Sequence, residues 1–509
     1  MILPRFFSSG NLLAVAGIIG APCGPAASFA AAADRGETRT SYPLSRSIPV
    51  VNNNNLTFEA VFSINSETTV VLNLDTGSSL LWVPTTNALC TEVSTGKSGS
   101  CAKTYGKTEI AASNGTSDVI LAANYGVGNV YGNLSEKMTL GFGGVDIDIV
   151  VGLGKQVLQP AGYFSSNEDG LLGLGLPYNI WTCDTSLCPS MEGSDRGCQI
   201  CGPFSAPFYA GHPVGPLNST SGGRATQKSA NLVQQIIERY GEVQMNFYIP
   251  MLDEGSLTFG EQDPSKYDGD MEWVDVVWNP DQSAPLGLPG YWQFVLGDGP
   301  WGRGAICVLD SGASLILVRT DLFQNWLAPL LAAVPGILPL NIPSLPTLYA
   351  VPLDSIDSLP TLSFPIGNQI FNLTGEQYSL TDPTNIAVLF FGFNFTLPEG
   401  YAVVRVSSMA LPDPTAILMG NPFMQWHYSS FKANNDSWVT GAQVGLAKIK
   451  QMNQPSTTRP NAQSWPSNAP SAGPSTAVAT SDSPSFDYVR TYLLRVASTC
   501  ILFGVLFVF

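Results

Sequence analysis

Residues 70–83 read VVLNLDTGSSLLWV, and residues 305–318 read AICVLDSGASLILV. In each stretch an Asp at a Gly-containing turn, Asp75 or Asp310, separates two apolar runs that are typical of strands. An acid at the same kind of turn, made twice in one chain, indicates two lobes that each donate one carboxylate. Two carboxylates brought together can share a proton, so the pair supplies both a general base and a general acid. That is the chemistry of peptide hydrolysis by an activated water.

The two motifs and their surroundings resemble the pepsin-like aspartic proteases, from about Thr57 to Lys448. One Asp-Thr-Gly triplet alone is more often a turn at the end of a strand. Two copies in apolar flanks, far apart in the chain, favour the catalytic interpretation. The resemblance implies a mostly β, bilobal fold of two related β-barrel-like lobes with the active-site cleft between them. We expect the N-terminal lobe over residues 44–262 and the C-terminal lobe over residues 263–450.

The resemblance also implies roles for residues beside the two acids. Thr76 and Ser311 would hydrogen-bond across the lobe junction, and Ser78 would donate to the outer oxygen of Asp75. Asp75 and Asp310 would titrate as a coupled pair, because two adjacent like charges do not both ionise readily. The expected supporting residues are Thr76, Gly77, Ser78, Ser311, Gly312 and Trp82.

A second group of residues is expected to contact the substrate. By resemblance, Tyr125-Gly126-Val127-Gly128 is the flap, a hairpin whose Gly residues allow a tight, mobile turn over the cleft. Tyr125 would cover the cleft, with Trp82 supporting it. Alone this pattern is more often an ordinary hairpin, and its position soon after the first motif favours the flap. Glu168 lies near the expected pocket for the residue before the cut, where an acid favours Lys or Arg; a solvated loop Glu is the alternative.

Ala313 is the departure within the second motif. The matching residue of the first motif is Ser78, whose hydroxyl can donate, whereas Ala313 has no donor. Loss of a hydrogen bond to an ionised carboxylate raises its pKa. We therefore expect Asp310 to be harder to ionise and the optimum to be less acidic than in relatives with a hydroxyl. Ala313→Thr should move the acidic limb of the pH-rate profile downward, unless a water replaces the hydroxyl.

Composition and charge narrow the function classes. The chain has 509 residues, 44% of them hydrophobic, which is enough for more than one core. Short apolar runs between turns favour a mostly β protein, with one helix expected over residues 229–240. The net charge of −16 argues against nucleic-acid binding, since phosphate binding requires clustered Lys and Arg. An acidic surface is equally consistent with a protein that acts at low pH and with one that only needs to be soluble. We expect no cofactor and no metal, and a monomer that acts on proteins or peptides.

Both ends of the chain read as targeting segments. Residues 1–33 combine Arg5 with an apolar run and small residues, the pattern of a signal peptide. Residues 451–485 read as a Pro-, Ser- and Thr-rich stalk. Residues 486–509 read as a GPI-anchor signal that is removed, because the final apolar run is short for a membrane span; a short anchor helix is the alternative. The chain thus resembles GPI-anchored, fungal-type secreted members of the family, at the plasma membrane or cell wall, and a full prosegment does not fit.

Export to an oxidising compartment accounts for the cysteines and sequons. The resemblance implies a disulfide between Cys90 and Cys101. Four further cysteines crowd into an insertion over residues 178–227, where two disulfides are favoured over a zinc site. Cys307 is left as a buried free thiol. The four are Cys183, Cys188, Cys198 and Cys201, and the seven N-glycosylation sequons begin at Asn55, Asn114, Asn133, Asn218, Asn372, Asn394 and Asn435.

The sequence therefore predicts a cell-surface aspartic endopeptidase. It would hydrolyse extended polypeptides at acidic to mildly acidic pH with a water activated between Asp75 and Asp310. The alternative is a pepsin-like binding or inhibitor module without proteolysis, which is usually marked by loss of an active-site Asp or Gly; both Asp-x-Gly triplets are intact here. A structural wall glycoprotein fits the stalk and sequons but leaves the paired acids unexplained.

Overall fold

The described part of the chain begins at Leu44 and ends at Lys450. The computed structural model describes residues 44–93, 95–111, 116–125, 128–159, 163–164, 166–176, 231–251, 254–277, 291–340, 347–382, 397–409, 411, 415–434 and 441–450. All of them belong to one compact unit, residues 1–454. The predicted signal segment 1–33, insertion 178–227, stalk 451–485 and anchor signal 486–509 lie outside the described residues.

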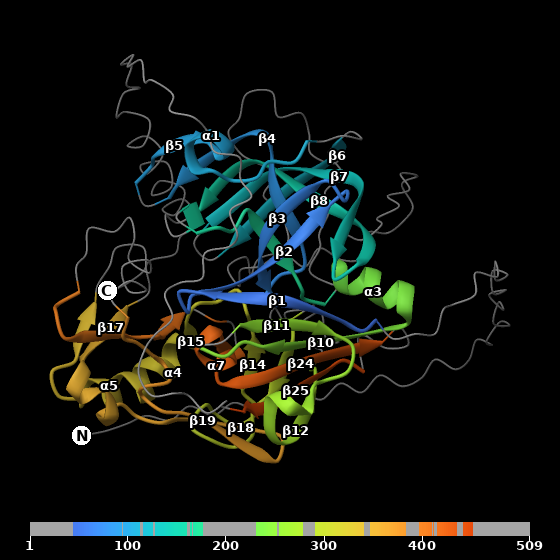
Figure 1. Ribbon diagram of the computed structural model, residues 1–509. Coiled ribbons are helices and arrows are strands. Elements are labelled where there is room, and N and C mark those ends of the chain that lie inside the picture. The colour runs from blue at the N-terminus through green and yellow to red at the C-terminus, as the bar shows by residue number, and fades with distance from the viewer. Residues whose placement is uncertain are drawn as a thin grey trace, which may run out of the picture. The chain divides into compact units, whose positions relative to one another are not determined.

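One large sheet dominates the fold (Figure 1). It has 14 strands within the described residues and runs from the flap region, through the first catalytic motif, to the last strands of the chain. It therefore crosses the boundary predicted between the lobes at residues 262 and 263. In order across the sheet the strands are β12 (Tyr267–Asp275), β25 (Gln443–Ile449), β24 (His427–Asn434), β10 (Glu242–Tyr248), β11 (Gly255–Phe259), β1 (Arg46–Asn53), β2 (Thr57–Ile64), β3 (Thr68–Asp75), β9 (Gly170–Gly173), β4 (Leu81–Glu92), β8 (Val145–Gln159), β7 (Gly128–Phe142) and β6 (Thr116–Tyr125), with β5 (Ser98–Ser100) paired to β4.

Three smaller sheets build the rest of the second half. A five-stranded sheet carries the second catalytic motif, and a four-stranded and a two-stranded sheet lie beyond it along the chain. Their strands are β13 (Gln293–Val295), β14 (Ile306–Leu309), β23 (Thr415–Met419), β15 (Ile316–Arg319) and β22 (Val406–Met409); β16 (Leu338–Leu340), β17 (Leu348–Pro352), β21 (Tyr401–Val404) and β20 (Ser379–Leu380); and β18 (Leu362–Ile366) with β19 (Gln369–Leu373).

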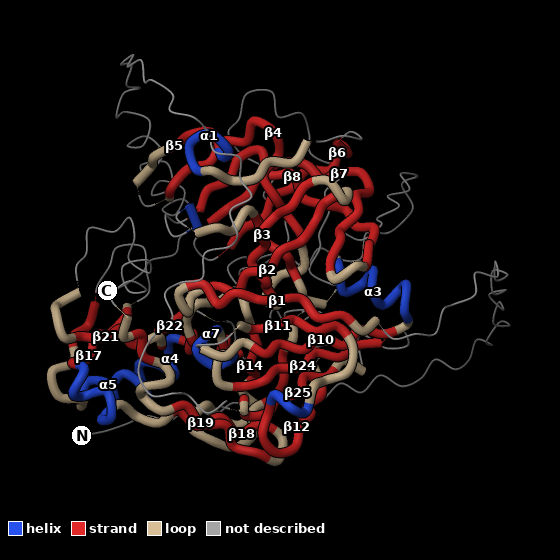
Figure 2. The backbone as a smooth tube through the Cα atoms, viewed as in Figure 1, coloured by secondary structure: helices blue, strands red, loops and turns tan. Residues whose placement is uncertain are grey.

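The helices of the described residues are short; α3 (Leu232–Tyr240) lies at the edge of the molecule, whereas α7 (Asn421–Met424) is buried among the strands (Figure 2). The predicted helix is confirmed as α3: the Asn231 side chain caps its first turn, and Gly241 ends it at a φ of 84°. No helix of the described residues combines the length and apolarity needed to cross a membrane. The other helices are α1 (Cys101–Tyr105), α4 (Thr320–Leu322), the π-helical turn η4 (Phe323–Leu327) and α5 (Ala328–Ala332), with 3₁₀ turns η3 (Pro264–Lys266) and η5 (Leu353–Ser358).

The internal duplication indicated by the two motifs is confirmed in the strand pairing. In the first half, β3 pairs in parallel with β9, and β9 pairs antiparallel with β4, the strand after the motif. In the second half, β14 pairs in parallel with β23, and β23 pairs antiparallel with β15. Each motif therefore joins two strands that flank the same kind of central strand. This topology carries the two acids to equivalent strand ends.

The two halves share a continuous apolar core. The largest buried cluster extends from Phe58 and Leu72 of the first half to Phe364 and Phe431 of the second. Burying one such side chain contributes about 1.5–3 kcal/mol relative to leaving it exposed. Trp292 is fully buried in this cluster, and its indole nitrogen donates to the carbonyl oxygen of Leu174, 2.8 Å away. The core thus fixes the two catalytic loops against a common interior.

Candidate active site

The two motif loops meet with their carboxyl groups in direct contact. The side chains of Asp75 and Asp310 are hydrogen-bonded to each other. Gly77 and Gly312 make this approach possible: a Cβ at Gly77 would overlap the Asp310 carboxyl, and a Cβ at Gly312 would overlap the Asp75 carboxyl. Each Gly also donates its backbone N–H to the acid of its own loop, over 2.8 and 2.9 Å. Glycine is therefore required at both positions by the space that the opposite acid occupies.

Thr76 and Ser311 lock the two loops together. The Thr76 hydroxyl donates to the carbonyl oxygen of Leu309 and accepts from the backbone N–H of Ser311, both at 2.9 Å. The Ser311 hydroxyl donates to the carbonyl oxygen of Leu74 at 2.7 Å and accepts from the backbone N–H of Thr76 at 2.9 Å. The hydrogen bonds expected across the lobe junction are thus confirmed. All four are buried, so they hold the register of the acids without competition from water.

A glycine lies directly behind each loop. A Cβ at Gly173, in β9, would overlap the backbone of Ser79 and Leu80, and a Cβ at Gly420, after β23, would overlap the carbonyl oxygens of Ala313 and Leu315. The backbone N–H of Asp310 donates to the carbonyl oxygen of Met419 at 2.8 Å. The central strand of each half therefore supports its catalytic loop through backbone contacts.

The hydrogen bonds around the two acids are unequal. Asp75 is 5% exposed and accepts from the Ser78 hydroxyl at 2.5 Å in addition to Gly77. Asp310 accepts from the backbone of Gly312, and Ala313 offers it no hydroxyl. Desolvation raises the pKa of both carboxyls; that of Asp310 lies well above its usual range, because the charge of Asp75 adds to desolvation. The Ser78 hydroxyl favours the ionised form of Asp75, so we expect the proton that the coupled pair shares to lie chiefly on Asp310.

Known proteins are similar to this chain over the same residues. A family model described as eukaryotic aspartyl protease matches residues 63–189 and 217–448, and both acids lie within them. The chain belongs to the eukaryotic aspartyl protease family. Its bilobal, mostly β architecture is the pepsin-like fold.

Individual relatives of this aspartyl protease are distant in sequence but cover most of it. Cathepsin D of Chionodraco hamatus is 27% identical over 395 residues, which cover 74% of this chain and 76% of the relative. Human napsin-A is 27% identical over 389 residues, covering 74% and 73%. Vacuolar protease A of Aspergillus fumigatus is 26% identical over 388 residues, covering 74% and 75%.

Tyr291 is a residue of the active site that sequence reasoning did not single out as one. It is 5% exposed, and the charges of Asp310 and Asp75 add to burial in raising the pKa of its hydroxyl. Tyr291 comes just before Trp292 and β13, and β13 pairs with β14, the strand that leads to Asp310. That position in the sequence is the signal that could have placed Tyr291 near the acids.

The hairpin expected to form the flap is described in part. β6 and β7 form the predicted hairpin, with Tyr125 opposite Gly128 in the pairing. Gly126, Val127 and the side chain of Tyr125 lie outside the described residues. Trp82 is 2% exposed and its ring centroid lies 6.0 Å from that of Tyr163. The hairpin is therefore confirmed, whereas contact of Tyr125 with a substrate stays a prediction.

Glu168 belongs to a buried cluster of charged groups rather than to a solvated loop. Its side chain is 6% exposed, and its Oε2 has no hydrogen-bond partner. The Lys107 ammonium donates to the carbonyl oxygens of Tyr163 and Glu168, both at 2.7 Å. Burial and the charge of the neighbouring Glu59 raise the pKa of Glu168 to about 8. This carboxyl therefore carries a proton at neutral and acidic pH.

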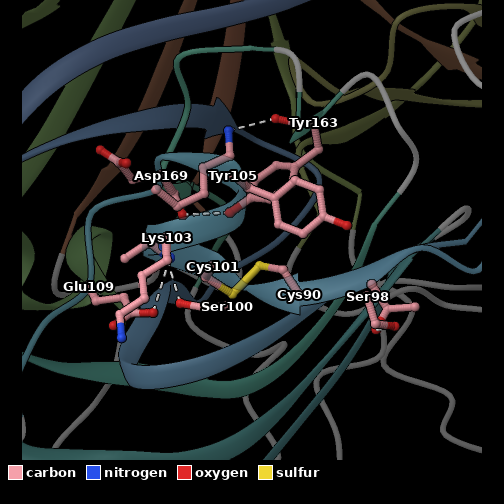
Figure 3. The surroundings of a disulfide bond; sticks show 12 residues. Cys90, Ser98, Ser100, Cys101, Lys103, Tyr105, Glu109, Tyr163 and Asp169 are labelled. Atoms are coloured by element: carbon pink, nitrogen blue, oxygen red, sulfur yellow. Dashed lines mark hydrogen bonds between the residues drawn. A yellow bond between two sulfur atoms is a disulfide. The ribbon is translucent and has the colours of Figure 1, made fainter. Parts of the chain in front are cut away.

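Asp169 connects this cluster of charged groups to β3, the strand that ends at Asp75. Its carboxylate accepts from the backbone N–H of Val71, in β3, at 2.9 Å and from that of Thr108 at 2.6 Å. The Tyr163 hydroxyl donates to the carbonyl oxygen of Asp169 at 2.7 Å (Figure 3). Within the described residues, no group of three or more His, Cys, Asp and Glu side chains is arranged to hold a metal ion.

The cysteines and sequons are placed as follows. The disulfide between Cys90 and Cys101 is confirmed and joins β4 to α1 (Figure 3). Cys307 is a buried free thiol, as predicted. Asn372 is exposed, Asn133 is half-buried, and the half-buried Asn55 accepts from the side-chain amide of Asn52. Outside the described residues lie Cys183, Cys188, Cys198, Cys201, Asn114, Asn218, Asn394 and Asn435.

Proposed function

We propose that this protein is an aspartic endopeptidase, which hydrolyses peptide bonds of extended polypeptides. The observation that carries the proposal is the pair of hydrogen-bonded carboxyls, Asp75 and Asp310, at equivalent ends of duplicated strand motifs. Membership of the aspartyl protease family supports a peptidase, and the triplets of both motifs are intact. A binding module has no need of two acids held together at the cost of their mutual repulsion.

In the proposed reaction, a water lies between the two carboxyls. The ionised acid, chiefly Asp75, takes a proton from the water as its oxygen attacks the scissile carbonyl carbon. The protonated acid, chiefly Asp310, donates its proton to the carbonyl oxygen, so that a neutral gem-diol forms. Asp75 then gives its proton to the leaving nitrogen, the carbon–nitrogen bond breaks, and a gem-diol hydroxyl returns its proton to Asp310, so that the carboxyl and amine products form and the pair again holds one proton. Base and acid roles thus follow from the unequal pKa values of the two carboxyls.

Activity at acidic to mildly acidic pH is part of the proposal. The pair is active with one shared proton, so the acidic limb reflects ionisation of the first carboxyl and the alkaline limb that of the second. The raised pKa of Asp310 supports an alkaline limb well above the usual Asp range. The two limbs together define the working range.

Substrate recognition and location complete the proposal. Tyr125, Gly126 and Val127 of the flap would cover an extended peptide, whose backbone would gain hydrogen bonds as an added strand does. The expected preference for Lys or Arg before the cut is not carried into this proposal, because Glu168 is buried and protonated in the acidic range and offers no charge to a basic side chain. Sequons, signal segment and C-terminal anchor signal favour a glycosylated, GPI-anchored, monomeric protease at the cell surface.

The test is cleavage of a denatured protein at acidic pH by the secreted enzyme. We expect cleavage that pepstatin inhibits and that Asp75→Asn abolishes, since an amide can neither take the proton nor carry the charge. Thr76→Val serves as a matched variant that weakens the junction but keeps both acids. Persistent cleavage by Asp75→Asn, or a folded wild type that cuts nothing between pH 3 and 7 (about the range set by carboxyl pKa values), would contradict the proposal.

A further inference from the structure

Arg405 is a buried cation whose position in the fold the proposed reaction does not explain. It lies between β21 and β22 and is 0% exposed. Burial lowers the pKa of its guanidinium to about 9, and no charged side chain contributes to that change. Within the described residues its hydrogen-bond partners are all neutral. Burying an arginine without a paired carboxylate costs free energy. We therefore expect the hydrogen bonds of Arg405 to serve a function that offsets this cost.

The guanidinium binds three oxygens from three segments. Nη1 donates to the carbonyl oxygen of Asn55 at 2.9 Å. Nη2 donates to the carbonyl oxygen of Gln377 at 3.3 Å and to Oε1 of Gln425 at 3.1 Å. Asn55 belongs to the first half of the chain and the other two belong to the second. Arg405 therefore spans the junction between the halves.

The segment that Arg405 holds is the turn between β1 and β2, residues 53–56. Asn54 and Asn55 adopt left-handed backbone conformations, with φ of 55° and 58°. Such a conformation is uncommon outside glycine and requires support from its surroundings. The hydrogen bond from Arg405 to the Asn55 carbonyl, with that from Asn52 to the Asn55 side chain at 3.1 Å, supplies it.

The next residue of this turn reaches the second catalytic loop. The carbonyl oxygen of Leu56 accepts from the Ser314 hydroxyl at 2.7 Å and from the Asn421 side-chain amide at 2.6 Å. Ser314 is the fourth residue after Asp310, and the backbone N–H of Asn421 donates to the carbonyl oxygen of Ala313 at 2.8 Å. A short chain of hydrogen bonds thus leads from Arg405, through the turn, to the loop of Asp310.

We propose that Arg405 is a positioning residue for catalysis, which fixes the Asp310 loop relative to the first lobe through the turn at residues 53–56. This inference rests on the proposed proteolysis. Arginine suits the task because its planar guanidinium offers several donors on separate nitrogens at fixed angles, whereas all donors of Lys lie on one nitrogen.

The neutral partners of Arg405 also fit work in acid. An ion pair between arginine and a carboxylate weakens when low pH protonates the carboxyl. Backbone carbonyl and amide oxygens do not titrate, and the guanidinium stays charged throughout the acidic range. The connection between the halves therefore holds at every pH at which the two acids are active.

The experiment compares Arg405→Lys and Arg405→Ala with the wild type of the full secreted chain. Because the position of one acid is disturbed and the substrate contacts are not, we expect kcat to fall about 10–100-fold with KM changed less than about threefold. We also expect the acidic and alkaline limbs of the pH-rate profile to move, because the pH interval between them reports how strongly the two acids are coupled. Millimolar guanidinium should restore part of kcat in Arg405→Ala. Arg239→Ala, which removes an exposed arginine on α3, is the control and should behave as wild type.

A second variant covers the case in which the Arg405 variants do not fold. Ser314→Ala removes the direct hydrogen bond between the Asp310 loop and the Leu56 carbonyl, and leaves the one from Asn421. It should lower kcat, by less than the Arg405 variants do, and move the limbs as those variants do. Loss of thermal stability in the Arg405 variants with kcat, limbs and guanidinium response unchanged would overturn the inference. So would a Ser314→Ala enzyme identical to the wild type. An inactive wild type would refute the proposed function itself, whereas an active wild type with unaffected variants would refute only this inference.

Discussion

Ala313 gives the sharpest prediction, because it is the difference between two otherwise matched acids. Asp75 accepts a hydrogen bond of 2.5 Å from Ser78, and the equivalent residue beside Asp310 has no hydroxyl. Ala313→Thr restores a donor at that place. A hydrogen bond to a charged group contributes about 1.5–3 kcal/mol, and 1.36 kcal/mol corresponds to about one pKa unit. We therefore expect the pKa governed by Asp310 to fall by about one to two units.

The structure changes which limb of the profile should respond. From the sequence we expected the acidic limb to move. Because Asp75 already has its donors and Asp310 has the higher pKa, the first ionisation belongs chiefly to Asp75 and the second to Asp310. Stabilising the charged form of Asp310 therefore lowers the alkaline limb by about one to two units and the acidic limb less. The active range becomes narrower from its alkaline side.

The assay is kcat/KM against pH with one fluorogenic peptide, because this quantity reports the ionisations of the free enzyme. Ala313→Val is the matched control, since Val has the shape of Thr without its hydroxyl. Ser78→Ala is the reciprocal variant and should raise the acidic limb. An alkaline limb that stays in place or rises in Ala313→Thr, or that falls equally in Ala313→Val, would refute the reasoning.

Three other predictions follow from contacts of the first half and from the sequons. Glu168 has an ordinary pKa of 4.5 and a folded pKa of about 8, so folding binds its proton; its stabilisation is complete below pH 4.5 and is lost as pH rises to 8. The difference of 3.5 pKa units at 1.36 kcal/mol each is about 5 kcal/mol, so thermal unfolding should show Glu168→Gln matching the wild type at pH 4 and exceeding it at pH 8. Replacing Cys90 and Cys101 by Ala opens a loop with a sequence separation of 11 and should cost about 3 kcal/mol in denaturant unfolding; an unchanged midpoint would contradict this. Peptide mass spectrometry should find more glycan at the exposed Asn372 than at Asn55, whose side chain is held in the turn beside Arg405, and equal occupancy would count against the described contacts.

Much of the fold could be predicted because the sequence patterns that indicate it each lie within a short stretch of the chain. The two motifs, their apolar flanks and the Tyr-Gly-x-Gly hairpin are each contained in about a dozen residues or fewer, and all lie where the pattern predicted. The Cys90–Cys101 disulfide and α3 follow from equally short stretches. Duplication then indicated the reaction class, because two equivalent acids that share a proton supply both a general base and a general acid.

What the sequence did not determine depends on neighbours that are far apart along the chain. Tyr291 approaches the acids only because β13 pairs with β14, and Arg405 reaches Asn55 across 350 positions. The raised pKa of Glu168 results from its burial and from the charge of Glu59, which no spacing rule connects to it. A pKa reports the solvent and charges around a group, and those are set by the tertiary structure.

The sequence by itself therefore determined the two acids, the glycines that let them approach, and the hydroxyl missing at Ala313. The tertiary structure decided how deeply the two acids are buried and which hydrogen bonds each accepts, and so which limb of the pH profile we expect Ala313 to control. The physical reason is that a motif specifies which groups are present, whereas burial and hydrogen bonds from distant residues set their free energies of ionisation.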